Sequence, residues 1–365
     1  KTLESAAKIK SQLNFLILRI WSYALELKVK RLPLHKQHEG RHSVEVFMKI
    51  QKHRKVLVDN LVGELVYTED TNFQFDKYTK VVHFKNGVLN LKTFELRPRT
   101  RNDNCTMALS YDYSEKVEED DVQLYVSFFK QFLPDPVTRR AFLEIIAKAC
   151  CGIVDEQFLF VIGKGGNGKS VVVQLIRIAC EFLVYGLARN TLLARNNDQL
   201  TRGLSRFETH PVRLVYAEEN DGKLFNTELI KQLTSGNSIE IKTMHSQSTK
   251  SITPMTTLLM FLNVPPRLYD DYAMNRRGKL IKSTSTFQKA AVWEQSIAKE
   301  VADNRDNAIA SLHKKHIYKA ENEFVKQFKK LGVKQAFWTF MKPYIQKVIK
   351  CVPTSIVICI PGKRS

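Results

Sequence analysis

The spacing of hydrophobic positions changes several times along the chain. Residues 1 to about 70 carry apolar side chains at the three- and four-residue spacing of a helix. Residues 80–96 alternate apolar and polar positions around Asn86-Gly87, a dipeptide that favours a tight hairpin turn. The pattern therefore predicts a helical segment followed by a β-hairpin region at 78–112.

Helical spacing then returns in two segments. It runs over residues 122–132 and again over 138–150, and Pro134 and Pro136 are expected to break the chain between them. Together with the preceding helices and hairpin, these segments predict an N-terminal α+β domain over residues 1–150.

Short, largely apolar runs dominate the middle of the chain. Residues 158–162, 212–217 and 257–262 have the composition of strands covered on both faces, and 279–282 adds a shorter run. Helical spacing resumes after the first run, so the pattern predicts an α/β arrangement in this part of the chain. The Lys-rich stretch at 286–350 has helical spacing and is expected to form a lid or collar.

Charge and cysteine content narrow the classes of function. The 365 residues include 57 Lys plus Arg against 37 Asp plus Glu, a formal charge of +20, which favours an anionic partner such as nucleic acid, nucleotide or lipid. Six scattered cysteines favour a reducing, intracellular setting over a secreted disulfide scaffold. The apolar stretch at 13–27 contains Arg19 and Glu26 and is too short to span a membrane.

The first apolar run leads into a glycine-rich loop. The loop consists of Gly163, Lys164, Gly165, Gly166, Asn167, Gly168, Lys169 and Ser170. It matches G-x-x-x-x-G-K-[ST] between a predicted strand and a predicted helix, where backbone N–H groups and the helix N-terminus surround a phosphate chain. In that setting Lys169 would contact the β and γ phosphates of ATP, and Ser170 would hold Mg²⁺. The alternative is a glycine-rich turn that opens an ordinary helix.

Two adjacent acids follow the second run. Glu218 and Glu219 stand where a metal-holding carboxylate and a base for water are needed. We expect one of the pair, with Glu218 preferred, to coordinate Mg²⁺ directly or through water, and the other, with Glu219 preferred, to polarise the attacking water. The sequence leaves the reverse assignment open. The alternative is that both acids only mark a solvated strand end.

A polar residue follows the third apolar run, and two basic residues precede the fourth. Asn263 ends the third run, where an amide can sense a γ phosphate and orient water, although Asn before prolines also commonly begins a turn. Arg276 and Arg277 precede the fourth run, and a guanidinium that reaches a γ phosphate stabilises the transition-state charge. Adjacent arginines in so basic a chain are weak evidence alone. Their position after the glycine-rich loop, the acid pair and Asn263 in the sequence makes the evidence stronger.

The ordered set resembles superfamily 3 helicases, and most closely the viral primase-helicase branch of poxviruses, giant viruses, phages and plasmids. The loop wording GKGGNGKS is similar to the first motif of that branch, and residues 84–91 (FKNGVLNL) are similar to a segment of its N-terminal helicase-associated domain. The resemblance covers roughly residues 80 to 290. It implies an AAA+-like ATPase core at 151–288, with parallel strands in the order 5-1-4-3-2, and a helical C-terminal region at 289–365.

The same resemblance implies an assembly and a substrate. ATP would lie between subunits of a ring, usually of six, with Arg276 or Arg277 reaching the neighbour's site. Residues 238–255 form two β-like arms around a polar tip, and in the family this place holds a hairpin that grips single-stranded or forked DNA. Here Lys242, His245 and Lys250 would contact the DNA backbone. A surface hairpin kept soluble by its charges is the alternative.

The leading hypothesis is a Mg²⁺-dependent, ATP-driven DNA helicase of a viral or mobile-element replication system, located at a replication site inside the host cell. A hydrolysis-deficient relative that binds nucleotide and DNA, and a P-loop small-molecule kinase or NTPase, are the alternatives. No primase active site is recognisable, and the chain begins at Lys1, so a primase domain is expected upstream or in trans, if one exists.

Overall fold

The computed structural model describes residues 76, 79–193, 203–218, 225–242, 249–266, 272–300, 304–321 and 323–351. All of these belong to one compact unit, Phe75–Ser365. The predicted helices at 1–70, together with Glu219 and His245, lie outside the described residues.

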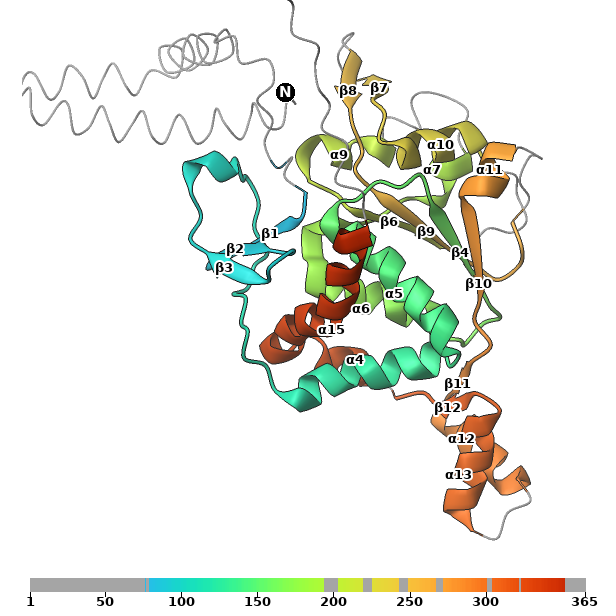
Figure 1. Ribbon diagram of the computed structural model, residues 1–365. Helices are drawn as coiled ribbons and strands as arrows, with labels where there is room; N and C mark the ends of the chain where they lie inside the picture. The colour runs from blue at the N-terminus through green and yellow to red at the C-terminus, as the bar shows by residue number, and fades with distance from the viewer. Residues whose placement is uncertain are drawn as a thin grey trace, which may run out of the picture. The chain divides into compact units, whose positions relative to one another are not determined.

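A five-stranded parallel sheet forms the centre of this unit (Figure 1). Its strands are β4 (Phe158–Ile162), β5 (Val184–Gly186), β6 (Leu214–Glu218), β9 (Thr257–Leu262) and β10 (Gly278–Lys282). They lie in the order β10-β4-β9-β6-β5, and every neighbouring pair is parallel. Numbered within the sheet, this is 5-1-4-3-2, so the predicted α/β class and strand order are confirmed.

Each face of the sheet is buried against helices, as the apolar runs require. On β4, Leu159 and Val161 join one core cluster, whereas Phe158, Phe160 and Ile162 join another. The first face packs on α4 (Glu119–Phe132), α5 (Pro136–Cys151), α6 (Lys169–Cys180) and α15 (Leu331–Cys351). The second faces α7 (Arg189–Leu193), α10 (Thr227–Ser235) and α11 (Tyr272–Arg277). Three short elements lie between the others in the sequence. The 3-10 helix η1 (Arg101–Asp103) precedes α4, η2 (Glu181–Leu183) lies between α6 and β5, and α9 (Arg206–Thr209) precedes β6.

The predicted hairpin is present, and a third strand extends it. β1 (Val81–Phe84), β2 (Gly87–Asn90) and β3 (Glu95–Arg97) form an antiparallel sheet. The turn itself differs from the prediction, because Phe84 pairs with Gly87 and leaves Lys85 and Asn86 at the tip. Gly87 is instead needed for close approach of β3, since a Cβ there would lie 2.5 Å from the carbonyl oxygen of Arg97.

The helices α4 and α5 confirm the predictions at 122–132 and 138–150, with corrected starts. α4 begins inside the acidic segment, and Glu119, Asp120 and Asp121 occupy its first turn, where they complement the helix dipole. Pro136 does not separate the helices but opens α5, behind the N-cap Asp135, whose side chain accepts a hydrogen bond from Thr138 N at 2.7 Å.

The C-terminal region is less purely helical than expected. α12 (Ala290–Lys299) and α13 (Arg305–Lys314) pack around their own small core of Trp293, Ile297, Ala308 and Leu312. Two strands that the spacing did not indicate, β11 (Thr286–Gln288) and β12 (Ile317–Lys319), pair in parallel at the base of these helices (Figure 1). The short α14 (Phe324–Gln327) then leads to α15.

The long helix α15 closes the first core. Phe337 and Trp338 are fully buried in it, and Trp338 Nε1 donates a hydrogen bond to the Tyr111 hydroxyl at 2.9 Å. These aromatics therefore fill a core. Residues of all three predicted domains, from Val82 to Ile349, share this one cluster.

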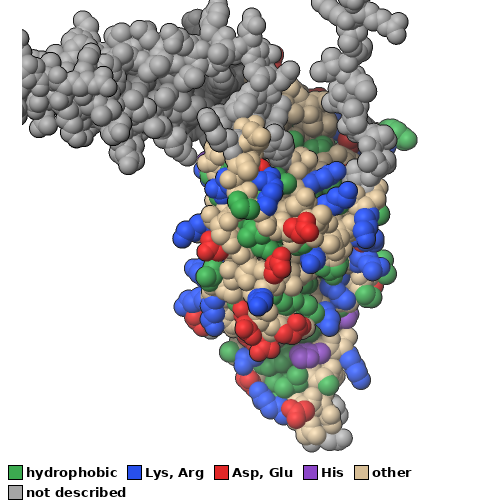
Figure 2. All heavy atoms as spheres, turned by 60° about the vertical axis from the view of Figure 1, so that its left-hand side comes forward, with side chains coloured by type: hydrophobic (Ala, Val, Ile, Leu, Met, Phe, Trp, Pro, Cys, Tyr) green, Lys and Arg blue, Asp and Glu red, His purple; other side chains and the backbone are tan. Residues whose placement is uncertain are grey.

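Charges of both signs are mixed on one face of the described part of the chain (Figure 2). Figure 2 shows Lys and Arg side chains spread over the face that it draws, with Asp and Glu among them. Across the described segments, no helix has the length and apolarity that crossing a membrane requires.

Candidate functional site

The glycine-rich loop connects β4 to α6 at the carboxyl end of the central strands. Gly163 N donates to Leu262 O, the last residue of β9, at 3.0 Å, so the loop begins against the neighbouring strand. Gly168 caps α6 at φ 84°, a left-handed conformation that glycine adopts without strain. A Cβ at Gly168 would also lie 3.0 Å from the Phe287 ring, so the sequence needs glycine here for two reasons.

The Lys169 ammonium joins the loop to the tip of β9. Its Nζ donates to Asn263 Oδ1 at 3.0 Å, to Lys164 O at 3.3 Å and also to Gly163 O. Lys169 and Asn263 are 94 positions apart in the sequence. The structure therefore brings together two of the residues that the sequence singled out, at the place where parallel strands end.

Asn167 is a further residue of this cluster, and its part in it was not anticipated. Its Oδ1 accepts from Lys169 Nζ at 2.9 Å, and the residue is only 3% exposed. Its amide also fills the space beside Gly163, where a Cβ would lie 1.6 Å from Nδ2. Asn167 thus positions the lysine ammonium, a role that the G-x-x-x-x-G-K-[ST] pattern leaves open because it fixes no residue there.

A cavity of about 760 Å³ surrounds this cluster. Among its lining residues are Gly165, Gly166, Asn167, Gly168, Lys169, Ser170, Glu218 and Asn263. The sequence-predicted loop, the first acid and the amide therefore share one cavity, of a size usual for small-molecule sites.

The residues present fit Mg²⁺ bound together with phosphates. Mg²⁺ usually keeps waters and takes one or two carboxylates plus substrate phosphate oxygens. Glu218, the exposed last residue of β6, and the exposed hydroxyl of Ser170 both open onto the cavity. In the part of the chain that the structure describes, no group of three His, Cys, Asp or Glu could hold a metal unaided, so the phosphates would have to complete the shell.

The two arginines lie elsewhere and share one partner. Arg276 and Arg277 end α11, and neither lines the cavity of its own chain. Glu156, between α5 and β4, forms ion pairs with Arg276 Nη2 at 2.6 Å and with Arg277 Nη2 at 3.2 Å.

The two guanidinium groups differ in exposure. The side chain of Arg277 is 13% exposed and donates to Lys231 O, whereas that of Arg276 is 56% exposed. The sequence could not have identified the shared carboxylate, because Glu156 lies 120 positions before Arg276 and only the tertiary fold brings the two together.

The predicted hairpin also exists. β7 (Ile239–Lys242) and β8 (Thr249–Ile252) pair antiparallel, with Lys242 opposite Thr249 and Ile241 opposite Lys250. The base is anchored by Ile239 and Ile252, each 7% exposed. The side chains of Lys242 and Lys250, like His245 at the tip, lie outside the described part of the chain.

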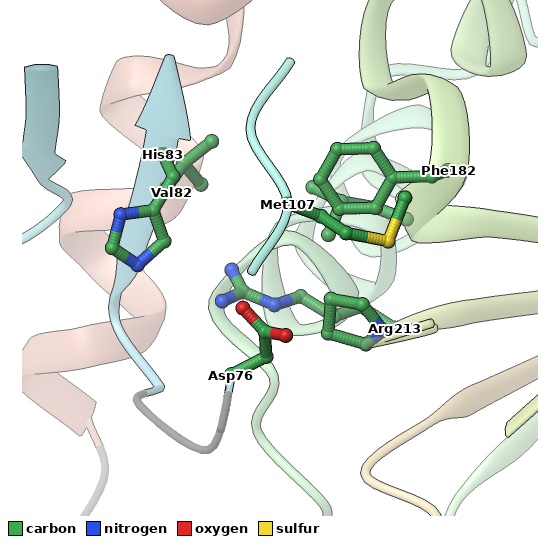
Figure 3. Close-up of a pocket in the computed structure, with 8 residues that line it drawn as sticks. Asp76, Val82, His83, Met107, Phe182 and Arg213 are labelled. Atoms are coloured by element: carbon green, nitrogen blue, oxygen red, sulfur yellow. The ribbon is translucent and has the colours of Figure 1, made fainter. Parts of the chain in front are cut away.

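A second, much smaller cavity of about 10 Å³ lies beside the N-terminal sheet (Figure 3). Arg213, at the start of β6, points its guanidinium toward Asp76, and His83 on β1 lies opposite. Arg213 donates to Cys150 O at 2.6 Å and to Val81 O at 2.8 Å, while burial lowers its pKa. The residue thus links β1, α5 and the parallel sheet.

The surroundings of His83 in this cavity disfavour its protonated form. Burial, and next the positive charge of Arg99, lower its pKa below the ordinary histidine value, and its Nδ1 has no hydrogen-bond partner among the described residues. The cavity has room for about one water molecule. We regard this cluster as structural, because the Arg213 guanidinium binds backbone carbonyls and the Asp76 carboxylate accepts from Thr106 N at 2.8 Å.

Comparisons with known proteins find two family matches and three viral relatives. Residues 45–137 match a family described as D5 N terminal like, and residues 161–277 match a family of unknown function, DUF5906. Three viral proteins, each named "putative helicase", are similar over overlapping lengths. The protein of Acanthamoeba polyphaga mimivirus is 23% identical over 236 residues, and that of invertebrate iridescent virus 3 is 27% identical over 218. The chain is a distant relative of these viral proteins.

The similarity covers only part of each relative. The match to the mimivirus protein covers 63% of this chain and 25% of that protein. The match to the iridescent virus 3 protein covers 56% of this chain and 22% of that protein. A third relative, from invertebrate iridescent virus 6, is 29% identical over 119 residues. Among solved structures, the apo C-terminal region of NrS-1 is 12% identical with a TM-score of 0.40, covering 64% of this chain and 49% of that one.

Proposed function

We propose that the chain is the ATPase core of a viral or mobile-element replication helicase, of the AAA+-like superfamily 3 type. The observation that carries the proposal is the Lys169–Asn263 contact at 3.0 Å inside a cavity that the phosphate loop and Glu218 also line. A loop, a carboxylate and an amide at the ends of three adjacent strands are the parts that nucleotide hydrolysis requires. The kinship with viral proteins named as helicases supports the choice of motor over other nucleotide enzymes.

Each residue has a defined part in this mechanism. Lys169 and the loop N–H groups bind the β and γ phosphates of ATP, and Ser170 and Glu218 hold Mg²⁺. Glu219 accepts the proton of the attacking water, and Asn263 orients that water against the γ phosphate. Bound Mg²⁺ neutralises charge that develops on the phosphate oxygens.

We further propose that the site is completed by a second copy of the chain. Arg276 is half exposed and lies outside the cavity of its own chain, as a residue acting on a neighbour would. A cationic group delivered to the γ phosphate is worth about 10³ to 10⁵ in rate where it has been tested. In a ring, usually of six, the hairpin of β7 and β8 would project Lys242, His245 and Lys250 toward single-stranded DNA.

The proposed domain division keeps residues 1–150 as the helicase-associated domain, 151–288 as the ATPase core and 289–365 as the C-terminal region. Priming, where it occurs, would belong to a primase domain elsewhere in the polypeptide or in trans. The proposed site of action is the replication site inside an infected or host cell.

One pair of variants tests the proposal. Lys169→Ala should abolish ATP hydrolysis because the phosphates lose their lysine ammonium, and phosphate release by the purified chain measures this. Lys92→Ala is the matched control, since the Lys92 side chain is exposed and lies outside the cavity. Hydrolysis at the wild-type rate in Lys169→Ala would refute the assignment.

A further inference from the structure

Aromatic side chains from outside the parallel sheet line the same cavity as the phosphate loop. They are Phe128 on α4, Phe287 on β11, Tyr318 on β12 and Phe324 on α14, here called the aromatic wall. Three of these four residues follow position 277, where the second family match ends, and the fourth lies on a helix of the first. No motif of the ATPase core accounts for them.

The aromatic wall begins at the phosphate loop itself. Phe287 N donates to Gly166 O at 2.6 Å, and the Phe287 ring lies over Gly168. From there the rings are continuous. Phe287 contacts Phe128 at 6.3 Å between centroids, with an interplanar angle of 26°, and Tyr318 at 5.7 Å and 34°. A ligand that extends from the loop therefore meets aromatic faces next.

The members of the aromatic wall differ in burial in a way that suits ligand binding. Phe128 and Tyr318 are 3% and 9% exposed, so neighbouring side chains fix their orientation. Phe287 and Phe324 are only half buried, and the Phe324 ring lies 5.4 Å from Phe128 at 33°. Buried rings thus support two rings that retain accessible surface within the cavity.

We propose that the aromatic wall binds the base of the nucleoside triphosphate by stacking, an inference that rests on the proposed function of the phosphate loop. A ligand that occupies both loop and wall must carry a phosphate chain and a flat apolar group, and a nucleotide has both. An unpaired DNA base could also stack on such rings, but the hydrogen bond from Phe287 to Gly166 joins the wall to the triphosphate site.

Stacking on the wall gives affinity without selecting a base. Every base presents a π-face, so ring-to-base stacking is tolerant of base identity. Removing one ring should therefore weaken ATP and GTP by the same factor. It should not affect inorganic tripolyphosphate, which has the phosphates but no base.

Calorimetric titration of the purified chain with three ligands tests the inference. The ligands are non-hydrolysable analogues of ATP and GTP, and inorganic tripolyphosphate, each with Mg²⁺. We expect Phe324→Leu and Phe287→Leu to weaken both nucleotide analogues about tenfold, as loss of one stacking ring predicts, and to leave tripolyphosphate unchanged. Phe182→Leu is the matched control, because Phe182 is also half buried but lies outside this cavity, and it should change none of the three.

Each other outcome contradicts a specific part of the account. Unchanged nucleotide affinity in Phe324→Leu overturns the base site, and so does an equal loss for tripolyphosphate, which would mean that the ring only supports the loop. Loss of oligonucleotide affinity with nucleotide affinity intact would assign the wall to DNA and also overturn the inference. If the wild-type chain binds neither nucleotide nor tripolyphosphate, the proposed function fails as well. Among the described residues, Phe287 and not Phe324 makes the backbone hydrogen bond to Gly166, so the Phe324 variant decides the matter where Phe287→Leu does not fold.

Discussion

The Lys169 ammonium has oxygen acceptors from both the loop and the tip of β9. Because Asn263 contacts this ammonium directly, the amide is placed to respond to whatever occupies the loop. A neutral amide both donates and accepts, so it can bind the lysine on one side and a water or phosphate oxygen on the other. We propose that Asn263 acts in the chemical step more than in binding.

This placement predicts a separation of binding from hydrolysis. Asn263→Ala should reduce ATP hydrolysis by about 10² to 10³, the usual loss for one polar group at a transition state, and leave nucleotide affinity within a few-fold. Phosphate release and calorimetric titration measure the two effects. Asn237→Ala, at an exposed position outside the cavity, is the control. Equal losses in affinity and rate would contradict the assigned role.

His83 predicts how stability depends on pH. Its pKa is lowered by burial and by Arg99 and Arg213, against the opposite effects of Asp103 and Asp76. His83 therefore takes up a proton more readily in the unfolded chain than in the native chain. The free energy of unfolding should fall as the pH drops below about 6.5, the ordinary pKa of histidine.

Urea denaturation between pH 7.5 and 5.5 measures this dependence, and His83→Phe removes the titrating group. The wild-type chain should lose stability over the interval, and the variant should lose less of it. Parallel curves for the two proteins would show that His83 is not the cause.

At the scale of elements, one buried arginine ties three segments together. Arg213 donates from β6 to the end of α5 and to β1, and it is 7% exposed. Its two carbonyl acceptors, Cys150 O and Val81 O, are 63 and 132 positions away in the sequence. Through Arg213, the N-terminal sheet, the end of α5 and the segment that enters β6 share polar contacts.

Arg213→Met should lower the free energy of unfolding by about 2 to 5 kcal/mol, because buried carbonyl groups lose their hydrogen-bond donors. Arg140→Met is a control, since the side chain of Arg140 is 69% exposed. Chemical denaturation of both variants provides the comparison. A loss under 1 kcal/mol for Arg213→Met would mean that water replaces the guanidinium without cost.

The sequence predicted these elements to different degrees. β9 matches the run at 257–262 residue for residue, because a strand buried on both faces leaves an uninterrupted apolar signal. β11 and β12 were missed, since three-residue strands inside a Lys-rich helical stretch have no detectable period. The hairpin turn was misplaced by one residue, because Gly87 serves close approach to β3 rather than the turn.

The sequence could predict the residues of the candidate site only where they lie at the ends of parallel strands. Lys169, Glu218 and Asn263 follow or end apolar runs, and parallel strands bring such positions to one edge. Glu156 and Phe287 reach the arginines and the loop through contacts between distant segments. Such contacts depend on tertiary packing and leave no local pattern.

At the scale of the whole molecule, we propose that the arginine pair acts between copies of the chain. Arg277 is nearly buried against Glu156 and Lys231 O, so it is suited to hold α11 in place. Arg276 shares the same carboxylate but remains half exposed, so it is suited to reach a neighbour. Glu156 would orient Arg276 in its own chain before the neighbour's nucleotide binds.

Mixing two inactive variants tests this arrangement. Arg276→Ala and Glu219→Gln should each abolish hydrolysis, and a mixture should regain part of it where an intact arginine faces an intact glutamate. Arg276→Ala should leave the unfolding free energy within about 1 kcal/mol, as expected of an exposed ion pair. Absence of rescue in mixtures that are shown by mass measurement to assemble would contradict action in trans.

The most direct test of the account is phosphate release by the wild-type chain with and without single-stranded DNA, at saturating Mg²⁺ and ATP. A DNA-translocating ATPase predicts release that rises when DNA is added and that Lys169→Ala abolishes. Release that DNA does not change would instead indicate a P-loop kinase or NTPase, and DNA binding without any release would indicate a relative that no longer hydrolyses ATP. Either of those two results would contradict the proposed motor.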